Sequence, residues 1–200
     1  MKILFAVETC IAHTDRDAVI RETWGKDLGN LVFFNGPMLN VADDYLSLPF
    51  KTQAICRWAA ERDYDFLARI DTDTFVHVPR LLASGFEQWD YSGYVREDFY
   101  PLYCYGPCYW LSRKAFTEVG KADWPAIAKS IGCSPTERSY EDVMVGAILE
   151  GTQIVPHHDE RYSHFTPVLP ENDKIIQHLT SRGVYSFDRM RECHRNAHDH

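Results

Sequence analysis

The sequence lacks the long apolar runs of a membrane protein and the excess of positive charge typical of a nucleic-acid-binding protein. No apolar segment approaches the roughly 18 consecutive residues that a membrane-spanning helix needs. Lysine and arginine number 21 against 29 aspartates and glutamates, which gives a formal net charge of -8 at pH 7. Because nucleic acid is bound largely by cations that neutralise its phosphates, we expect no nucleic-acid partner. A small phosphate-bearing ligand stays compatible with this charge if a divalent cation binds among the acids.

The first residues also lack the features of an export signal. The opening "MKILFAVETC" is much too short to span a membrane, and no small-residue cleavage site follows it. We therefore expect a protein that is not exported, with reduced thiols at its six cysteines. Cys104 and Cys108 are four residues apart, but no second pair at the usual spacing completes a zinc site.

No repeat, low-complexity tract or linker divides the chain, so we expect one domain over residues 1–182. Residues 183–200 are expected to form a tail, with a short helix followed by disorder. Apolar segments alternate with amphipathic ones, which is typical of an α/β fold with a mostly parallel sheet. Strands are expected at 2–7, 31–34, 66–70 and 152–156, with strand-like pieces over 91–111. Helices are expected after the N-caps Thr14, Ser47, Ser112 and Ser139, the last one closing at Gly151, and from Pro79.

The segment "FLARIDTDTFVHV" (66–78) runs an apolar strand directly into Asp71 and Asp73. Side chains at i and i+2 of an extended backbone point to the same side, so these two carboxylates can converge. Ligands of α/β sheets bind beyond the carboxyl ends of the strands, and carboxylates with room for phosphate and water suit Mg²⁺ or Mn²⁺. The alternative is that Asp71 caps a turn and Asp73 is solvated.

A second interpretation of the same residues is a different enzyme. A strand followed by "DTDT" resembles the first motif of haloacid-dehalogenase-like, Mg-dependent phosphatases, with Asp71 as nucleophile and Asp73 as acid. That motif normally ends the first strand, whereas two strands and two helices are expected before it here. No Asp-Asp pair follows downstream, so the phosphatase is kept as the alternative.

Five blocks of the sequence occur in a recognisable order. They are "RDAVIRETWG" (16–25), "DDYLSLPFKTQAICRWA" (43–59), "IDTDTFVHVPRLL" (70–82), "YPLYCYGPCYWLS" (100–112) and "EDVMVGAILEG" (141–151). They resemble the blocks of the β-1,3-galactosyltransferase and fringe family of glycosyltransferases, and the resemblance extends to about residue 182. It implies a GT-A (Rossmann-like) fold with a mixed, mostly parallel sheet flanked by helices. It also implies a nucleotide-diphosphate sugar donor, Mn²⁺ (or Mg²⁺) and inversion at the anomeric carbon.

The resemblance assigns the central roles residue by residue. Asp73 matches the metal-binding aspartate of the family, and Asp71 matches the one that contacts the ribose or supports the metal. The family also has a late histidine on the metal, for which we choose His178 and hold His164 in reserve. Asp142 matches the general base, and its place in the first turn of a helix suits a carboxylate that accepts a proton.

Further residues match positions near the donor and the sugar. On the donor side these are Thr9, Arg21, Lys51 and Thr72, together with Asp71. On the side of the acceptor or sugar pocket they are Gly106, Tyr109 and Glu141. The sequence departs from the family where Thr72 replaces the middle acid of a triple-Asp motif, and where Pro107 and Cys108 stand in place of glycines.

The sequence therefore predicts a metal-dependent inverting glycosyltransferase. It would move a hexose or N-acetylhexosamine from a UDP-sugar to a hydroxyl of a glycan acceptor, in β-1,3 linkage. The alternatives are the phosphatase and a non-catalytic carbohydrate-binding module. Because the membrane anchor and lumenal disulfides of the family's animal members are not expected here, we expect a cytoplasmic protein of bacterial or viral origin.

Overall fold

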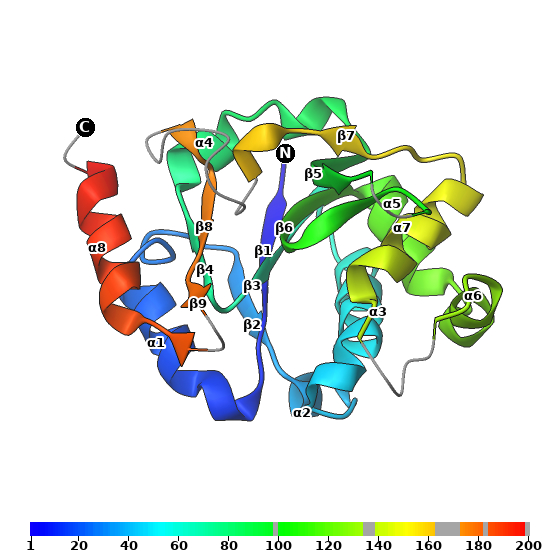
Figure 1. Cartoon of the computed structure of the whole chain (residues 1–200), viewed down its shortest axis with the longest axis horizontal. Helices are drawn as coiled ribbons and strands as arrows, with labels where there is room; N and C mark the ends of the chain where they lie inside the picture. The colour runs from blue at the N-terminus through cyan, green and yellow to red at the C-terminus, as the bar shows by residue number, and fades with distance from the viewer. Residues whose placement is uncertain (98–99, 134–138, 163–172, 182–183, 199–200) are drawn as a thin grey trace.

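A six-stranded sheet forms the centre of the molecule (Figure 1). The computed structural model describes residues 1–97, 100–133, 139–162, 173–181 and 184–198. The strand order is β2-β1-β3-β6-β5-β7. The strands are β1 (Ile3–Glu8), β2 (Leu31–Phe34), β3 (Phe66–Asp71), β5 (Tyr91–Arg96), β6 (Tyr103–Ser112) and β7 (His157–His158). Only the pairs of β6 with β3 and with β5 are antiparallel within this sheet, so the expected mixed, mostly parallel sheet is confirmed.

Helices cover both faces of the sheet, as the strand sequences predict. Alternate residues of β1 enter two different cores, Leu4 and Ala6 on one face and Phe5 and Val7 on the other. Figure 1 shows α3, α5 and α7 on the first side and α1 and α8 on the second. The helices are α1 (Thr14–Glu22), α2 (Gly36–Leu39), α3 (Leu48–Ala60), α4 (Val78–Leu82), α5 (Arg113–Lys121), α6 (Trp124–Ser130), α7 (Glu141–Gly151) and α8 (Phe187–His198). None of the described helices has the length and apolarity needed to cross a membrane.

A small second sheet joins the segment after β3 to the late part of the chain. β4 (Thr74–Val76) pairs antiparallel with β8 (Ile176–His178), and the register places Thr74 opposite His178. The backbone N–H of Leu179 donates to the carbonyl of Asp73, at 2.7 Å. A hairpin of β9 (Thr180–Ser181) and β10 (Val184–Tyr185) follows. The chain is therefore held so that residues 73 and 178 are neighbours.

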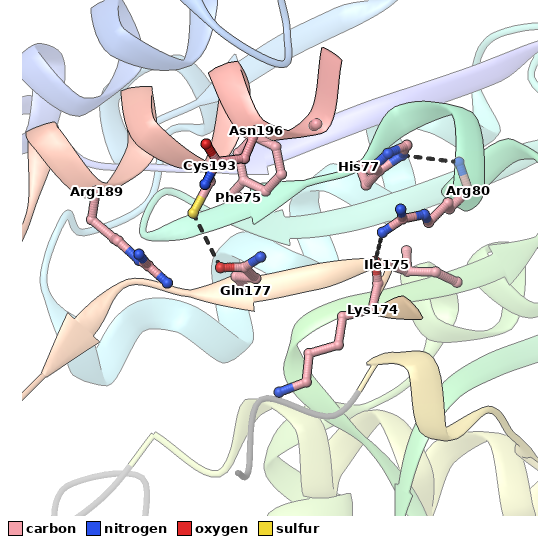
Figure 2. Close-up of a pocket in the computed structure, with 10 residues that line it drawn as sticks. Phe75, His77, Arg80, Lys174, Ile175, Gln177, Arg189, Cys193 and Asn196 are labelled. Carbon is pink, nitrogen blue, oxygen red and sulfur yellow. Dashed lines mark hydrogen bonds between the residues drawn. The ribbon is translucent and has the colours of Figure 1, made fainter. Parts of the chain in front are cut away.

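The helix expected in the tail is present as α8, and it packs against this small sheet. Met190 and Cys193 are buried, and the Cys193 thiol donates to Oε1 of Gln177 at 3.1 Å (Figure 2). The phenyl ring of Phe75 lies below the same helix (Figure 2). Residues 187–198 are thus packed onto the rest of the molecule.

Two of the four expected N-caps lie where the sequence predicts. Ser112 caps α5, with its hydroxyl accepting from the N–H of Ala115. Ser47 is the N-cap residue of α3, although its hydroxyl donates to Asp44 instead of capping the helix. The Thr14 prediction is wrong, because His13 is the N-cap residue and Thr14 is already helical.

The predictions around α7 need three corrections. Tyr140, with φ 48°, occupies the N-cap position that was expected for Ser139. Gly151 is the last helical residue, and Thr152 is the C-cap. The strand expected over 152–156 is not formed, because Gln153 adopts φ 63° and turns the chain so that only the two residues of β7 pair with β5.

Candidate active site

The carboxyl ends of β1 and β3 open onto two adjoining pockets. The first, here called the β1 pocket, has a volume of about 230 Å³ and is lined by residues that include Glu8, Thr9, Arg16, Lys51 and Asp73. The second, the β6 pocket, has a volume of about 350 Å³ and is lined by residues that include Arg69, Arg96, Gly106, Glu141 and Asp142. Both pockets are lined by Tyr45, Leu48 and Asp71, so together they form one cleft.

Acids outnumber cations around the β1 pocket. Its lining contains five carboxylates, Glu8, Asp43, Asp44, Asp71 and Asp73, against the cations Arg16 and Lys51. The buried Lys51 ammonium is already engaged, because it donates to the Thr9 carbonyl at 2.9 Å and lies 2.7 Å from Asp43. An anionic ligand in this pocket would therefore be accommodated best together with a divalent cation.

Asp73, which lines the β1 pocket, contacts His178, which lines the β6 pocket. Their Oδ2 and Nε2 atoms are 3.2 Å apart. The β4–β8 pairing brings the two residues close, because it sets His178 opposite Thr74, the residue after Asp73. Burial acts to lower the pKa of His178, but the hydrogen bond and charge of Asp73 outweigh it and raise that pKa overall. A carboxylate and an imidazole in contact are a chemically suitable pair of ligands for Mn²⁺ or Mg²⁺ with phosphate and water. In the described part of the chain, no three His, Cys, Asp or Glu residues are grouped as a metal site, and His164 lies outside the described residues.

Asp71 faces a different partner from Asp73. Its Oδ1 accepts a hydrogen bond from Nη1 of Arg69, which lies two residues earlier on the same face of β3. Burial is the main cause that raises the pKa of Asp71 to about 6, with Arg69 opposing this rise and the charge of Asp73 adding to it. The two aspartates are thus close in sequence but are held by different groups.

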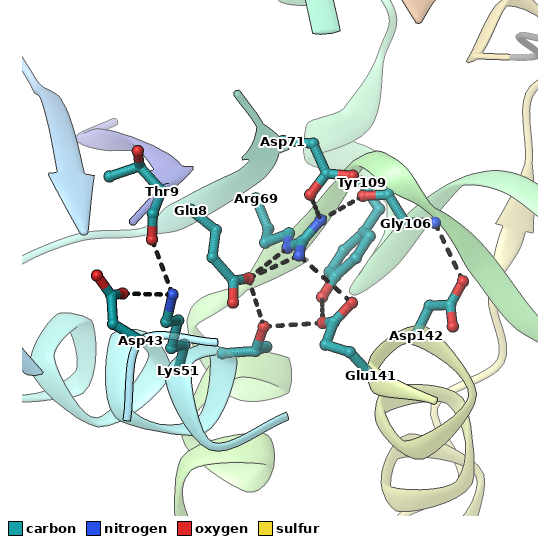
Figure 3. Close-up of polar contacts among 11 residues, drawn as sticks. Glu8, Thr9, Asp43, Lys51, Arg69, Asp71, Gly106, Tyr109, Glu141 and Asp142 are labelled. Carbon is teal, nitrogen blue, oxygen red and sulfur yellow. Dashed lines mark hydrogen bonds and ion pairs between the residues drawn. The ribbon is translucent and has the colours of Figure 1, made fainter. Parts of the chain in front are cut away.

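A buried polar cluster lies behind Asp71 (Figure 3). Arg69, with a side chain 2% exposed, donates to Oε2 of Glu8 from both Nε and Nη2, at 2.9 and 2.6 Å. Its Nη2 also lies 3.6 Å from Oε2 of Glu141. The Thr52 hydroxyl lies 2.9 Å from both Glu8 and Glu141. We call Glu8, Thr52, Arg69, Asp71 and Glu141 the Arg69 cluster.

Asp142 projects from the first turn of α7 into the β6 pocket. Its Oδ2 accepts from the N–H of Gly106 at 3.3 Å, and its Oδ1 accepts from the N–H of Val143 at 2.9 Å. Burial, followed by the charge of Glu141, raises the pKa of Asp142 to about 6, against the lowering effect of these N–H groups. A carboxylate with such a pKa is ionised at neutral pH and is a better proton acceptor than an ordinary aspartate.

The expected donor-side residues do not all lie at the cleft. Thr9 and Thr72 line the β1 pocket, as does Lys51. Arg21 is exposed on α1 and lies outside both pockets, with its guanidinium 4.2 Å from the centre of the Phe33 ring. The arginine of α1 that lines the β1 pocket is Arg16, whose guanidinium lies 4.7 Å from the Tyr185 ring centre.

On the other side of the cleft, Gly106 and Glu141 line the β6 pocket, whereas Tyr109 is fully buried and donates to Glu141. Four tyrosines and an arginine that were not predicted from the sequence also line this pocket: Tyr45, Tyr103, Tyr105, Tyr140 and Arg96. The aromatic content of residues 91–111 was the available signal, but it indicates strands as readily as it indicates a binding surface.

The fold is that of the GT-A glycosyltransferases. Among solved structures, the chain is similar to a glycosyltransferase involved in the glycosylation of the major capsid of PBCV-1, at a TM-score of 0.53 and 13% identity, with 96% of this chain and 99% of that chain covered. It is also similar to the galactosyltransferase LgtC in complex with donor and acceptor sugar analogues, at a TM-score of 0.52 and 12% identity, with 98% and 96% covered. No protein-family model and no curated protein matches the sequence. The resemblance to the β-1,3-galactosyltransferase and fringe family stays a prediction.

Proposed function

We propose that this protein is a metal-dependent, inverting glycosyltransferase that moves a hexose or N-acetylhexosamine from a UDP-sugar to a hydroxyl of a glycan acceptor, in β-1,3 linkage. The observation that carries the proposal is the cleft itself. Asp73 lines its β1 half, Asp142 and His178 line its β6 half, and Asp71 lines both halves. The contact between Asp73 and His178 therefore joins the two halves. The GT-A fold supports a nucleotide-sugar donor at the carboxyl ends of β1 and β3.

The β1 pocket is assigned to the donor. Asp73 of this pocket and His178, which lines the adjoining β6 pocket, would hold Mn²⁺ or Mg²⁺ with support from Asp71, which lines both. The ion would supply charge neutralisation for the diphosphate when it is bound. Arg16 provides a guanidinium on the same pocket wall, a group suited to phosphate oxygens. Thr9 and Thr72 provide short polar side chains at the ends of β1 and β3.

The β6 pocket is assigned to the acceptor. Asp142 accepts the proton of the acceptor hydroxyl, whose oxygen forms a bond to the anomeric carbon of the donor sugar. The bond from that carbon to the diphosphate oxygen breaks, and its electron pair leaves with the nucleoside diphosphate. Attack from the face opposite to the leaving group gives inversion. The four tyrosines of this pocket provide the apolar surface and polar tips that a sugar ring requires.

A panel of nucleotide sugars tests the proposal. The protein is incubated with each donor and Mn²⁺, and release of free nucleoside diphosphate is measured beside thermal stabilisation. The proposal predicts that one or more UDP-sugars stabilise the protein and release UDP, and that Asp73→Ala abolishes both effects. The transferase is contradicted if no donor is turned over and none raises the melting temperature.

The same assay separates the alternatives. A phosphatase would release phosphate from simple phosphate esters without any nucleotide sugar. A carbohydrate-binding module would bind glycans without releasing nucleoside diphosphate, and Asp142→Asn would leave its behaviour unchanged.

A further inference from the structure

Arg69 contacts both halves of the cleft. It lies on β3 opposite Tyr109 of β6, two residues before Asp71. Its Nη1 donates to the Asp71 carboxylate and also, at 2.6 Å, to the carbonyl oxygen of Gly106 (Figure 3). The N–H of Gly106 in turn donates to Asp142, at 3.3 Å. A single buried guanidinium is therefore bonded directly to Asp71 and is connected to Asp142 through the backbone of one residue.

Four of the five N–H groups of Arg69 donate hydrogen bonds to protein acceptors. Nε and one N–H of Nη2 bond Glu8, the two N–H groups of Nη1 bond Asp71 and Gly106, and Nη2 also lies 3.6 Å from Glu141. A guanidinium has five N–H groups in a fixed planar fork, so these four hydrogen bonds and the ion-pair contact with Glu141 occupy most of its capacity. Arg69 is therefore suited to act on a substrate through Asp71 and Asp142 and not by direct contact.

The local backbone permits this connection. Gly106 has no side chain, and a Cβ built there would lie 3.6 Å from Oδ2 of Asp142 and 3.9 Å from Nη1 of Arg69. The antiparallel direction of β6 sets Gly106 beside the carboxyl end of β3, since Ile70 pairs with Cys108. Asp142 reaches the same point from the first turn of α7.

We propose that Arg69 is a positioning residue that fixes the donor-side carboxylate of Asp71 and the acceptor-side carboxylate of Asp142 relative to each other. The expected effect on the rate of transfer rests on the proposed function. The effect of Arg69 on the positions of the two carboxylates does not depend on it. A lysine at this position keeps the charge and cannot reach Asp71, Gly106 and Glu8 together, because it has one nitrogen where arginine has a fork.

The structural test compares wild type, Arg69→Lys and Thr52→Val by NMR of ¹³C-labelled aspartate carboxyls at pH 8, where Asp71 and Asp142 are both ionised. Resonances are assigned with Asp71→Asn and Asp142→Asn. Thr52 is the matched control, because its hydroxyl bonds Glu8 and Glu141 in the same cluster but contacts neither Asp71 nor Gly106. We expect the carboxyl ¹³C chemical shifts of both Asp71 and Asp142 to change in Arg69→Lys, and to change less in Thr52→Val. The inference is overturned if the carboxyl chemical shift of Asp142 in Arg69→Lys equals that of wild type. It is also overturned if this shift changes as much in Thr52→Val as in Arg69→Lys.

The kinetic test uses the same variants. In Arg69→Lys we expect kcat for transfer to fall about 10- to 100-fold while the KM for donor and acceptor stays within roughly threefold, since misplaced groups cost rate more than binding. Thr52→Val should keep kcat within roughly threefold of wild type. If Arg69→Lys does not fold, the double variant Glu8→Gln/Arg69→Gln replaces it in both tests. This variant removes both charges of the buried Arg69–Glu8 ion pair, so neither partner is left as an unpaired buried charge. A wild type that transfers no sugar would contradict the proposed function, while the NMR comparison needs no substrate and still decides the role of Arg69.

Discussion

Asp142 combines ready access to the β6 pocket with a carboxylate that burial makes more basic. Its pKa of about 6 means that it is ionised at pH 7 and takes up a proton as the pH falls through 6. Only the ionised form can accept a proton from the acceptor. We therefore expect kcat to fall on the acid side with an apparent pKa of about 6, by about tenfold for each further pH unit.

Initial rates between pH 5 and 8, at saturating donor and acceptor, measure this limb. Asp142→Asn should lower kcat by about 10²- to 10⁴-fold and remove the limb from the residual rate. Glu150→Gln is the matched control, since Glu150 is an exposed acid at the far end of the same helix. A limb that persists in Asp142→Asn would assign the proton acceptor to another group.

Glu8 gives a separate prediction on stability. Its side chain is fully buried, and within the part of the chain that the structure describes Oε1 has no hydrogen-bond partner. Burial is the main cause that raises its pKa from 4.5 to about 7, with Arg69 opposing this rise and Glu141 adding to it. Between pH 4.5 and about 7, Glu8 is protonated in the folded protein and ionised in the unfolded chain. This difference in proton binding stabilises the folded protein at low pH, and the stabilisation is lost as the pH rises through about 7.

A glutamine at position 8 cannot titrate, so the free energy of unfolding of Glu8→Gln should not show the fall with rising pH that ionisation of Glu8 causes in wild type. We expect the variant to gain about 1 to 3 kcal/mol relative to wild type on going from pH 5 to pH 8. Urea unfolding of both proteins at the two pH values measures the difference. The raised pKa values of Asp71 and Asp142 act in the same direction but are present in both proteins. Identical pH dependence of the two proteins would show that Glu8 is ionised normally.

The close packing of helix α7 against β6 determines the position of Asp142. Gly146 lies where α7 meets the start of β6, and a Cβ there would be 2.5 Å from the Leu102 carbonyl oxygen and 2.7 Å from Cβ of Tyr103. Such distances require the helix to move away from the strand. Asp142 sits one turn earlier on α7, so any such movement displaces it from Gly106.

Gly146→Ala should therefore lower the free energy of unfolding by about 1 to 3 kcal/mol, although alanine is the better helix former. The rate of transfer should fall with it. Gly151→Ala is the matched control on the same helix, because a Cβ there would have no atom of the described residues outside the helix itself within 4 Å. It should be neutral or stabilising by up to about 1 kcal/mol. Chemical denaturation and rate measurements on both variants distinguish the two glycines; equal effects would rule out close packing as the cause.

The pairing of β4 with β8 brings together Asp73 and His178, which are more than 100 residues apart in the sequence. If these two side chains hold the ion, His178→Ala should raise the Mn²⁺ concentration for half-maximal thermal stabilisation by UDP by about 10- to 100-fold. His157→Ala is the control, because His157 stacks on Trp89 at the β7 edge of the sheet. An unchanged Mn²⁺ requirement in His178→Ala would remove this histidine from the metal site.

The elements with strong local signals were predictable. β3, ending on Asp71, follows from its apolar run, and the start of α5 follows from Ser112. β8 was not identified as a strand from residue pattern, because its three residues are ordered by pairing with β4. The choice of His178 came from the family resemblance. Arg69 carried no signal, since an arginine inside "FLARI" becomes meaningful only when acids from β1 and α7 reach it.

The arrangement of the whole molecule explains why the proposed donor and acceptor pockets meet at one edge of the sheet. The parallel strands β1 and β3 end there with Glu8 and Asp71, and the antiparallel β6 passes the same edge with Gly106. The overall negative charge, -8, is matched by an acidic β1 pocket. A diphosphate should therefore bind poorly without a divalent cation, and chelation with EDTA should abolish the thermal stabilisation by a UDP-sugar.

In the proposed reaction, one cleft binds a nucleotide sugar and transfers its sugar, with Asp142 as the proton acceptor. This reaction is tested most directly by measuring UDP release from the UDP-sugar that stabilises the protein, with Mn²⁺ and acceptor present, in wild type, Asp73→Ala and Asp142→Asn. We expect turnover by wild type, and neither stabilisation nor turnover by Asp73→Ala. Asp142→Asn should be stabilised as wild type is, with turnover slower by about 10²-fold or more. Equal rates for wild type and Asp142→Asn, or phosphate release from simple esters without any nucleotide sugar, would contradict the proposed reaction.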